Sequence, residues 1–242
     1  MTKPGSKRIY LTFGDSLAYG HLREVCYTLR NGGLCILPSD TCYALAGIPT
    51  RQDVIGRIAK ILPEKEHEPI SLSFGSLQMV EDWVVLTAND YRTIDKFCPG
   101  PITVVCVIKE TRDKIAISDL LHTSGTIGVR IPDSPVERQI SIELGNPITT
   151  CAIRSDNNDI VRSYDDAIDI VRSRLSNLNE NILLAAIQMK RIKYRDLSTV
   201  VSVQPSMASP YTIHVFRPGV IEPEEITDAI RSLSFWDVED MT

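Results

Sequence analysis

The chain has 242 residues, with 26 Lys and Arg against 31 Asp and Glu, and a formal net charge of −5 at pH 7. This balance argues against a globally basic protein that wraps nucleic acid, although it leaves room for a local basic face. No apolar run approaches the roughly 20 residues that a membrane helix needs, and the N-terminal residues lack the apolar core of a secretion signal. The sequence therefore predicts a cytoplasmic protein without a membrane segment.

The six cysteines and four histidines are dispersed along the chain. No CxxC pair occurs and most cysteines lie in apolar stretches, which is typical of reduced core thiols rather than of a disulfide framework. We therefore expect neither disulfides nor a metal site.

Helix and strand patterns alternate along the chain. The predicted helices cover residues 22–29, 50–62, 88–97, 134–145, 164–175 and 222–233. The predicted strands cover residues 34–37, 70–74, 102–108, 126–131, 148–152, 182–189, 199–203 and 211–216. The interleaving predicts an α/β domain with a mixed sheet, in which the late strands form hairpin-like antiparallel pairs. Because no repeat or linker is evident, we expect one domain over 8–221 and a helical acidic tail over 222–242.

Local signals support several of these elements. Ser134, Pro135 and Glu137 combine an N-cap, a proline in the first helical position and an acid in the first turn of one helix. Alternation over 70–74 places two serines on a face of that strand that we expect to be wet.

Four short segments concentrate groups that bind ligands. Residues 38–43 (PSDTCY) follow an apolar strand, where open α/β sheets place ligands, although an Asx or ST turn is the alternative. Arg130, within 128–133 (GVRIPD), can bind a carboxylate or phosphate through two parallel hydrogen bonds, and an ordinary ion pair is its alternative. Residues 197–201 (LSTVV) and 216–219 (FRPG) are the other two segments.

Together, in this order and spacing, these segments resemble the YrdC/YciO family. The resemblance is carried by GGLCILPSDTCYALAG (32–47), FCPGPITVVCVI (97–108), TIGVRIPDSPVERQI (126–140), DLSTVVSV (196–203) and VFRPGVI (215–221). The best-known members make threonylcarbamoyl-adenylate from threonine, bicarbonate and ATP for modification of tRNA. The resemblance implies a single α/β YrdC-like domain with a twisted mixed sheet and helices around a concave cavity. In that family the cavity binds an amino acid and a nucleotide, and it has been associated with double-stranded RNA or tRNA.

The resemblance also implies two sets of binding residues. The amino-acid substrate would be held by Ser39, Thr41, Tyr43, Arg130, Ser198 and Thr199. The nucleotide phosphates would be approached by Arg57 and Arg217. ATP with Mg²⁺ is the one cofactor that the resemblance implies.

The chain departs from the synthases of that family at two places. Synthases carry a Lys-x-Arg before a Pro-Leu strand, which brings two cations to the triphosphate, whereas Leu62 and Glu64 stand there in this chain. Where the synthases have Ser-Ala-Asn, this chain has Cys151, Ala152 and Ile153, so the asparagine amide is absent. A Leu-Pro at the first place resembles the YciO branch, and we expect the protein not to be the housekeeping synthase.

Three functions stay open on the sequence. The first is an RNA-linked YciO-type protein, in which Arg191, Lys193 and Arg195 share one face of an extended segment and contact phosphates, unless they are only a solvated sheet edge. The second is an enzyme that makes or hydrolyses a threonylcarbamoyl-like or adenylated ligand, with His67 as a candidate for proton transfer. The third is a non-catalytic sensor of a small ligand. The sequence leaves the oligomeric state open.

Overall fold

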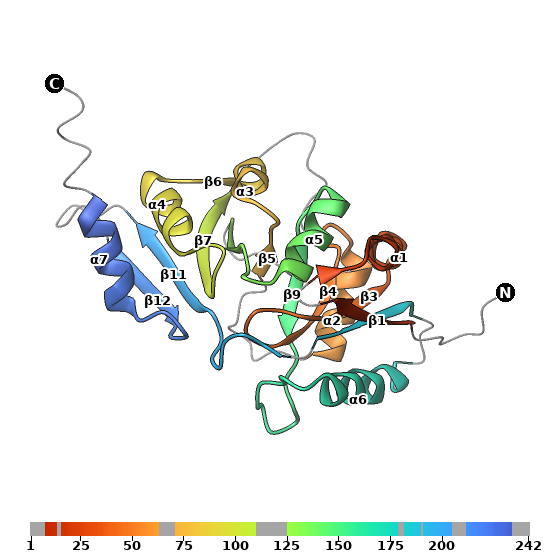
Figure 1. Cartoon of the computed structure of the whole chain (residues 1–242). Helices are drawn as coiled ribbons and strands as arrows, with labels where there is room; N and C mark the ends of the chain where they lie inside the picture. The colour runs from red at the N-terminus through yellow and green to blue at the C-terminus, as the bar shows by residue number, and fades with distance from the viewer. Residues whose placement is uncertain are drawn as a thin grey trace.

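The computed structural model describes residues 8–13, 16–62, 71–109, 125–178, 182–189, 191–204 and 212–233 (Figure 1). The helices are α1 (Tyr19–Arg30), α2 (Gln52–Ile61), α3 (Leu77–Trp83), α4 (Ala88–Phe97), α5 (Pro135–Leu144), α6 (Tyr164–Ser176) and α7 (Pro223–Leu233). The strands are β1 (Arg8–Phe13), β2 (Ser16–Leu17), β3 (Leu34–Pro38), β4 (Tyr43–Gly47), β5 (Ser71–Ser73), β6 (Val84–Val85), β7 (Ile102–Ile108), β8 (Thr126–Arg130), β9 (Ile148–Ala152), β10 (Leu184–Gln188), β11 (Thr199–Gln204) and β12 (Thr212–Arg217).

The strands form one mixed sheet in the order β12-β11-β7-β8-β5-β9-β4-β3-β10-β1-β2, with β6 beside β7. Strand β10 pairs in parallel with both β1 and β3, whereas β4 pairs antiparallel with β3 and with β9. At the other end, β7 pairs in parallel with β11 and antiparallel with β8. The predicted α/β class and twisted mixed sheet are confirmed.

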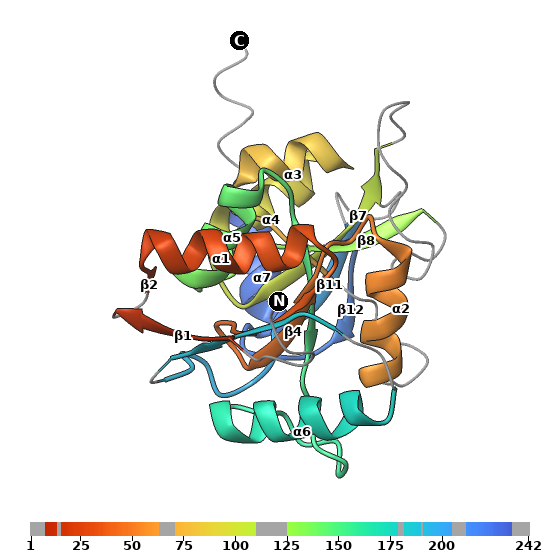
Figure 2. The same ribbon diagram turned by 90° about the vertical axis from the view of Figure 1, so that its right-hand side faces the viewer.

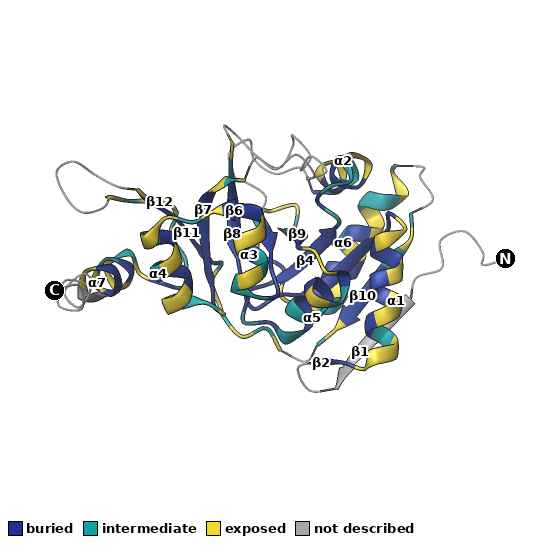
Figure 3. Cartoon of the chain, turned by 90° about the horizontal axis from the view of Figure 1, so that it is seen from above, coloured by how far each residue is buried: buried dark blue, intermediate teal, exposed yellow. Residues whose placement is uncertain are grey.

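Helices cover both faces of the sheet around β3, all five residues of which are buried. Successive side chains of a strand point to opposite faces, so Cys35 and Leu37 pack with α1 and α5, whereas Leu34 and Ile36 join the larger core with α2 and α6. Figure 2 shows α1 and α5 on one side of these strands and α6 on the other. Figure 3 shows the strands largely buried and the outer sides of the helices exposed.

Helix α7 packs against the rest of the fold, and the sequence assigned residues 222–233 to an acidic tail. It packs against α4, and its Ile226 and Ile230 are 0% and 1% exposed in the larger core. The acidic residues occupy the outer face of the helix, which explains why composition alone suggested a tail. The expected tail after residue 233 lies outside the described residues.

Ile226→Ala is expected to destabilise the whole domain. Removing a fully buried isoleucine side chain costs about 2–5 kcal/mol. The exposed Asp228 on the same helix gives a matched control, because Asp228→Ala should change stability by no more than about 0.5 kcal/mol. Urea unfolding followed by circular dichroism compares the two variants. An Ile226→Ala variant as stable as Asp228→Ala would contradict the docking of α7.

Three further details differ from the sequence prediction. Strand β10 does not form a hairpin with β11 but lies between β1 and β3. Ser73, expected on a wet face, is fully buried. Strand β4 and helix α3 were not predicted as elements.

The six cysteines are free thiols, and five of them are buried. Burial raises the pKa of the Cys42 thiol to about 11, which suits a core residue rather than a nucleophile. In the described ranges, no helix has the length and apolar character needed to cross a membrane.

Candidate functional site

A cavity of about 480 Å³ lies at the carboxyl ends of the parallel neighbours β3 and β10. Ser39 and Asp40 follow β3, and Met189 follows β10. The lining residues are Ser39, Asp40, Asp133, Ser134, Pro135, Met189, Arg191 and Lys193. Ligands of α/β sheets gather at the carboxyl ends of strands, where turns expose hydroxyl and carboxylate groups without breaking the ladder. We therefore call this the β3 cavity and take it as the candidate site.

Asp40 contacts two other segments of the chain at the β3 cavity, one through its buried carboxylate and one through its backbone carbonyl. Its Oδ1 accepts a hydrogen bond from Arg130 Nη2 at 2.5 Å, and its Oδ2 accepts one from the Asp133 backbone N–H at 2.9 Å. The Asp40 carbonyl accepts the Tyr194 N–H at 2.9 Å. Burial alone would lower the pKa of Arg130, but the Asp40 and Glu137 carboxylates outweigh it and raise that pKa. Arg130 is therefore a fixed cation at this site.

Glu137 belongs to the same cluster, although the sequence indicated only an acid in the first turn of a helix. Its side chain is 0% exposed, and its Oε2 accepts a hydrogen bond from Ser39 Oγ at 2.5 Å. Burial raises the pKa of Glu137, while the charge of Arg130 opposes the rise. A buried acid bonded to Ser39 can hold or release a proton beside the cavity.

Glu137→Gln is expected to change how stability depends on pH. Because burial raises the pKa of Glu137 above its ordinary 4.5, the folded protein keeps this proton at pH values where the unfolded chain has lost it. That stabilisation is complete below pH 4.5 and is lost as the pH rises through the folded-state pKa. The free energy of unfolding of the wild type, measured by urea unfolding, should fall relative to that of Glu137→Gln as the pH rises towards neutrality. A constant difference would contradict the raised pKa.

A second group of polar residues continues from Arg130 along the sheet. Ser73 on β5 is paired with Arg130 on β8, and the β7–β8 register continued by one pair brings Thr103 beside Arg130. Thr103 Oγ1 lies 3.0 Å from Ser198 Oγ, to which Arg217 Nη2 donates at 3.0 Å. Alternation in the strands puts these five side chains on one face of the sheet. We call them the polar row: Ser73, Thr103, Arg130, Ser198 and Arg217.

Arg217 is held by the backbone as well as by a hydroxyl. Its Nε and Nη2 donate to the Ser198 carbonyl at 3.2 and 3.1 Å. The chain passes so close to Leu197 after Arg217 that a Cβ on Gly219 would lie 2.3 Å from the Leu197 carbonyl oxygen. The FRPG segment therefore needs glycine at its last position to keep the arginine against β11.

Tyr43 and Thr41 are buried, as core residues are. The Tyr43 hydroxyl donates to the Met189 carbonyl at 3.3 Å and accepts the Met189 N–H at 3.1 Å. Tyr43 thus holds a residue that lines the β3 cavity instead of lining it itself. Thr41 Oγ1 points to the Cys42 sulfur at 3.8 Å and is also outside the cavity lining.

Two predicted residues do not join the others. The Thr199 hydroxyl donates to the Ile221 carbonyl at 2.6 Å and accepts the Ile221 N–H at 3.0 Å, so it faces away from Ser198. This corrects the expectation that both hydroxyls face one site, because neighbours in an extended chain point to opposite faces. Arg57 forms an ion pair with Asp53 and donates to the Gly32 carbonyl. Gly32 precedes β3, whereas Ser39 follows it, so Arg57 lies at the opposite end of the strand from the cavity.

Two of the positions at which this chain is expected to depart from a synthase lie in the core. Leu62 and Ile153 are 5% and 0% exposed, and both belong to the larger hydrophobic cluster. Neither side chain offers a charge or an amide to a ligand. Glu64 and His67, which the sequence also singled out, lie outside the described residues.

A basic segment, Arg191, Lys193 and Arg195, borders the β3 cavity. These three residues are exposed, whereas Ile192 and Tyr194 between them are half-buried, as the predicted alternation requires. The segment bends instead of forming a strand. Lys193 forms an ion pair with Asp133, and Arg191 and Lys193 both line the cavity.

The arrangement suits a ligand with carboxylate or phosphate groups. Arg191 supplies a cation and Ser39 a hydroxyl at the cavity itself. Arg130, Arg217, Thr103 and Ser198 are hydrogen-bonded within the protein. Within the described part of the chain, no three His, Cys, Asp or Glu side chains cluster as a metal site.

A family model matches most of the chain. The model of the Sua5/YciO/YrdC family, whose description reads "Telomere recombination", matches residues 27–219. The chain belongs to this family. The resemblance stated from the sequence is therefore confirmed.

Curated relatives are about a quarter identical to this chain over the residues that align. A Methanocaldococcus jannaschii protein provisionally named a threonylcarbamoyl-AMP synthase is 24% identical over 198 residues, covering 82% of this chain and 85% of the relative. The threonylcarbamoyl-AMP synthase of Bos taurus is 26% identical over 127 residues, covering 52% of this chain and 44% of the relative.

Solved structures share the fold at low sequence identity. E. coli YciO is 19% identical with a TM-score of 0.73, covering 90% of this chain and 98% of YciO. P. abyssi Sua5 complexed with L-threonine is 18% identical with a TM-score of 0.73, covering 93% of this chain. This chain spans only 61% of the length of that Sua5.

Proposed function

We propose that this protein binds a ligand with an amino-acid carboxylate or a nucleotide phosphate, as threonylcarbamoyl-adenylate has, at the β3 cavity and polar row. We propose also that it does not synthesise threonylcarbamoyl-adenylate at the rate of a synthase. One observation carries the proposal. The polar row keeps two arginines and two hydroxyls hydrogen-bonded in place, whereas Leu62 and Ile153 are buried in the core. Binding groups are therefore present where two groups of the synthase motifs are missing.

Charge explains why binding and synthesis separate. Adenylation builds negative charge on the triphosphate, and a cation placed there stabilises the transition state more than the ground state. Arg130 and Arg217 can still attract the ligand, but an apolar Leu62 adds nothing as that charge grows. The loss of one such contact commonly slows the reaction by roughly 100-fold to 1,000-fold.

Calorimetry with L-threonine and with ATP tests the binding half of the proposal on the full chain. We expect saturable binding of at least one of them, weakened by added salt for ATP because phosphates are held by cations. An absence of binding by both ligands at low salt would overturn the proposal. A second copy of the titration with Mg²⁺ present examines the cofactor that the family resemblance implies.

The catalytic synthase is the second candidate function, because curated relatives of this chain carry that name. It would use ATP, threonine and bicarbonate at the same cavity. Release of pyrophosphate separates the two functions, since binding alone releases none.

We propose further that the basic segment contacts the phosphates of tRNA or duplex RNA, which its exposure beside the cavity supports. The double variant Arg191→Gln/Arg195→Gln should bind RNA more weakly. Its affinity should also fall less steeply with salt: the slope of log affinity against log salt should be shallower by roughly two, one for each lost phosphate contact. Fluorescence anisotropy with a duplex RNA over a series of KCl concentrations measures both. Arg172→Gln, at an exposed arginine of α6, is the control. A wild type that binds no RNA at low salt would refute the contact. A tRNA-linked role is consistent with the cytoplasmic location that the sequence predicts.

A further inference from the structure

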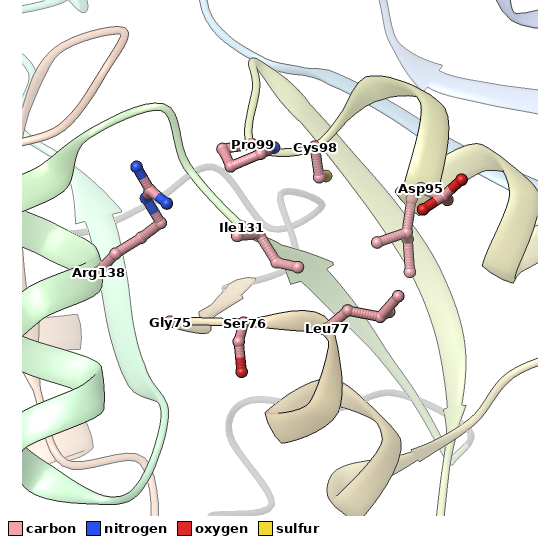
Figure 4. Close-up of a pocket in the computed structure, with 9 residues that line it drawn as sticks. Gly75, Ser76, Leu77, Asp95, Cys98, Pro99, Ile131 and Arg138 are labelled. Carbon is pink, nitrogen blue, oxygen red and sulfur yellow. The ribbon is translucent and has the colours of Figure 1, made fainter.

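A second cavity, of about 240 Å³, lies between α3, α4 and α5, apart from the candidate site (Figure 4). Its apolar lining includes Leu77, Ile94, Pro99 and Ile131. Gly75 also lines it. A Cβ at this position would lie 2.4 Å from the Ile142 side chain, so glycine allows the backbone to approach α5 closely. The packing of three helices thus leaves a small space of mixed polarity behind the end of β8.

Two oppositely charged side chains face this cavity. Figure 4 shows Arg138 at one end and Asp95 at the other, with Pro99 and Ile131 between them. Neither side chain forms an ion pair or hydrogen bond with any residue that the structure describes, and Arg138 Nε is buried without a partner. A buried donor with no acceptor is costly and rare in native proteins, so it points to a group that binds there.

We propose that this cavity is a binding site for a small linear zwitterion, with a carboxylate on Arg138, an ammonium near Asp95 and a short aliphatic chain between. Arg138 can receive the carboxylate through parallel N–H donors, and its Nε would gain the acceptor that it lacks. Asp95 opposes a second anionic group and favours a cation at its end. Leu77, Ile94 and Ile131 remove the methylene groups of the ligand from water.

The zwitterion site shares a wall with the candidate site. Along β8, Arg130 turns to Asp40 while the next residue, Ile131, lines the second cavity. Along α5, Glu137 bonds to Ser39 while Arg138, next in the chain, faces the second cavity. A ligand that draws Arg138 toward itself therefore acts on the turn of helix that positions Glu137. This makes the zwitterion an effector whose coupling to the candidate site is reciprocal, and only this coupling rests on the proposed function.

The test titrates the full chain with 5-aminopentanoate, following binding by calorimetry, with pentanoate and pentylamine as probes that lack one charge. We expect saturable binding of one 5-aminopentanoate per chain and weaker binding of both single-charge probes. Arg138→Gln and Asp95→Asn should each weaken binding by roughly tenfold, because each removes one charge-assisted contact. Asp95 is exposed, so Asp95→Asn tests the site even where Arg138→Gln folds poorly.

Ser198→Ala separates this site from the polar row, since it alters the candidate site and leaves the second cavity intact. Binding of 5-aminopentanoate should be unchanged in Ser198→Ala, whatever becomes of threonine or ATP binding. No binding, binding unaffected by both Arg138→Gln and Asp95→Asn, or binding lost in Ser198→Ala would each overturn the zwitterion site. None of these results depends on whether the proposed function is correct.

Discussion

Arg130→Gln is expected to lower the free energy of unfolding by about 3–5 kcal/mol, more than Asp40→Asn does. Arg130 faces two buried carboxylates, so its removal leaves Asp40 and Glu137 without their cation. Removing the charge of Asp40 instead leaves Arg130 beside Glu137, whose pKa should then fall so that its carboxylate becomes the partner. Removing Arg130 should therefore lower the free energy of unfolding more than removing the charge of Asp40, although the two residues form one ion pair.

Urea unfolding at pH 7 of the wild type, both single variants and the double variant measures this difference. The double variant should be more stable than the sum of the two single losses predicts, because Arg130→Gln costs most while Asp40 still carries the charge that is left without its cation. Gln139 is half-buried and lies on α5, the helix that carries Glu137. Gln139→Ala therefore serves as a control for general disturbance of α5. Equal losses in Arg130→Gln and Asp40→Asn would contradict the role of Glu137 in this cluster.

Arg217→Gln is expected to weaken ATP binding by roughly 10-fold to 100-fold, as the loss of a charge-assisted hydrogen bond does. Arg217 belongs to the polar row, where three hydrogen bonds to Ser198 fix its guanidinium. Arg57→Gln is the matched control, because the family resemblance assigned both arginines to the nucleotide. In the structure, Arg57 instead contacts Asp53 and the Gly32 carbonyl, before the start of β3.

Calorimetric titration of each variant with ATP, at one salt concentration, compares these two arginines. The wild type and Arg57→Gln should bind equally, and both should bind more tightly than Arg217→Gln. Unfolding curves of the variants establish that each is folded at the titration temperature. If Arg57→Gln weakens binding and Arg217→Gln does not, the polar row is not the nucleotide site.

The sequence was sufficient to predict most elements but not how they pair. Apolar runs such as 34–37 and 102–108 lie within β3 and β7, because a buried strand needs hydrophobic residues on both faces. Strand β10 has the same pattern, yet its partners, β1 and β3, are distant in sequence and no local signal specifies them. Helix α7 has an acidic outer face and an apolar inner face, and only the neighbouring α4 shows that the inner face is buried.

The candidate site was predicted in part, and its misses have physical causes. Ser39, Arg130, Ser198 and Arg217 lie in motifs, and the structure brings them to one region of the sheet. Glu137 was missed as a site residue because an acid in the first turn of a helix is ordinarily explained by the helix dipole. Its bond to Ser39 joins residues 98 positions apart, which no pattern in the sequence specifies.

Pyrophosphate release from ATP in the presence of L-threonine and bicarbonate measures whether this protein binds its ligand without acting as a synthase. The full chain and a synthase of the family are assayed side by side under the same conditions. We expect this protein to bind a ligand but to release pyrophosphate at least about 100-fold more slowly than the synthase, because the groups at Leu62 and Ile153 cannot stabilise the transition state. A rate equal to that of the synthase would refute binding without synthesis and establish the second candidate function.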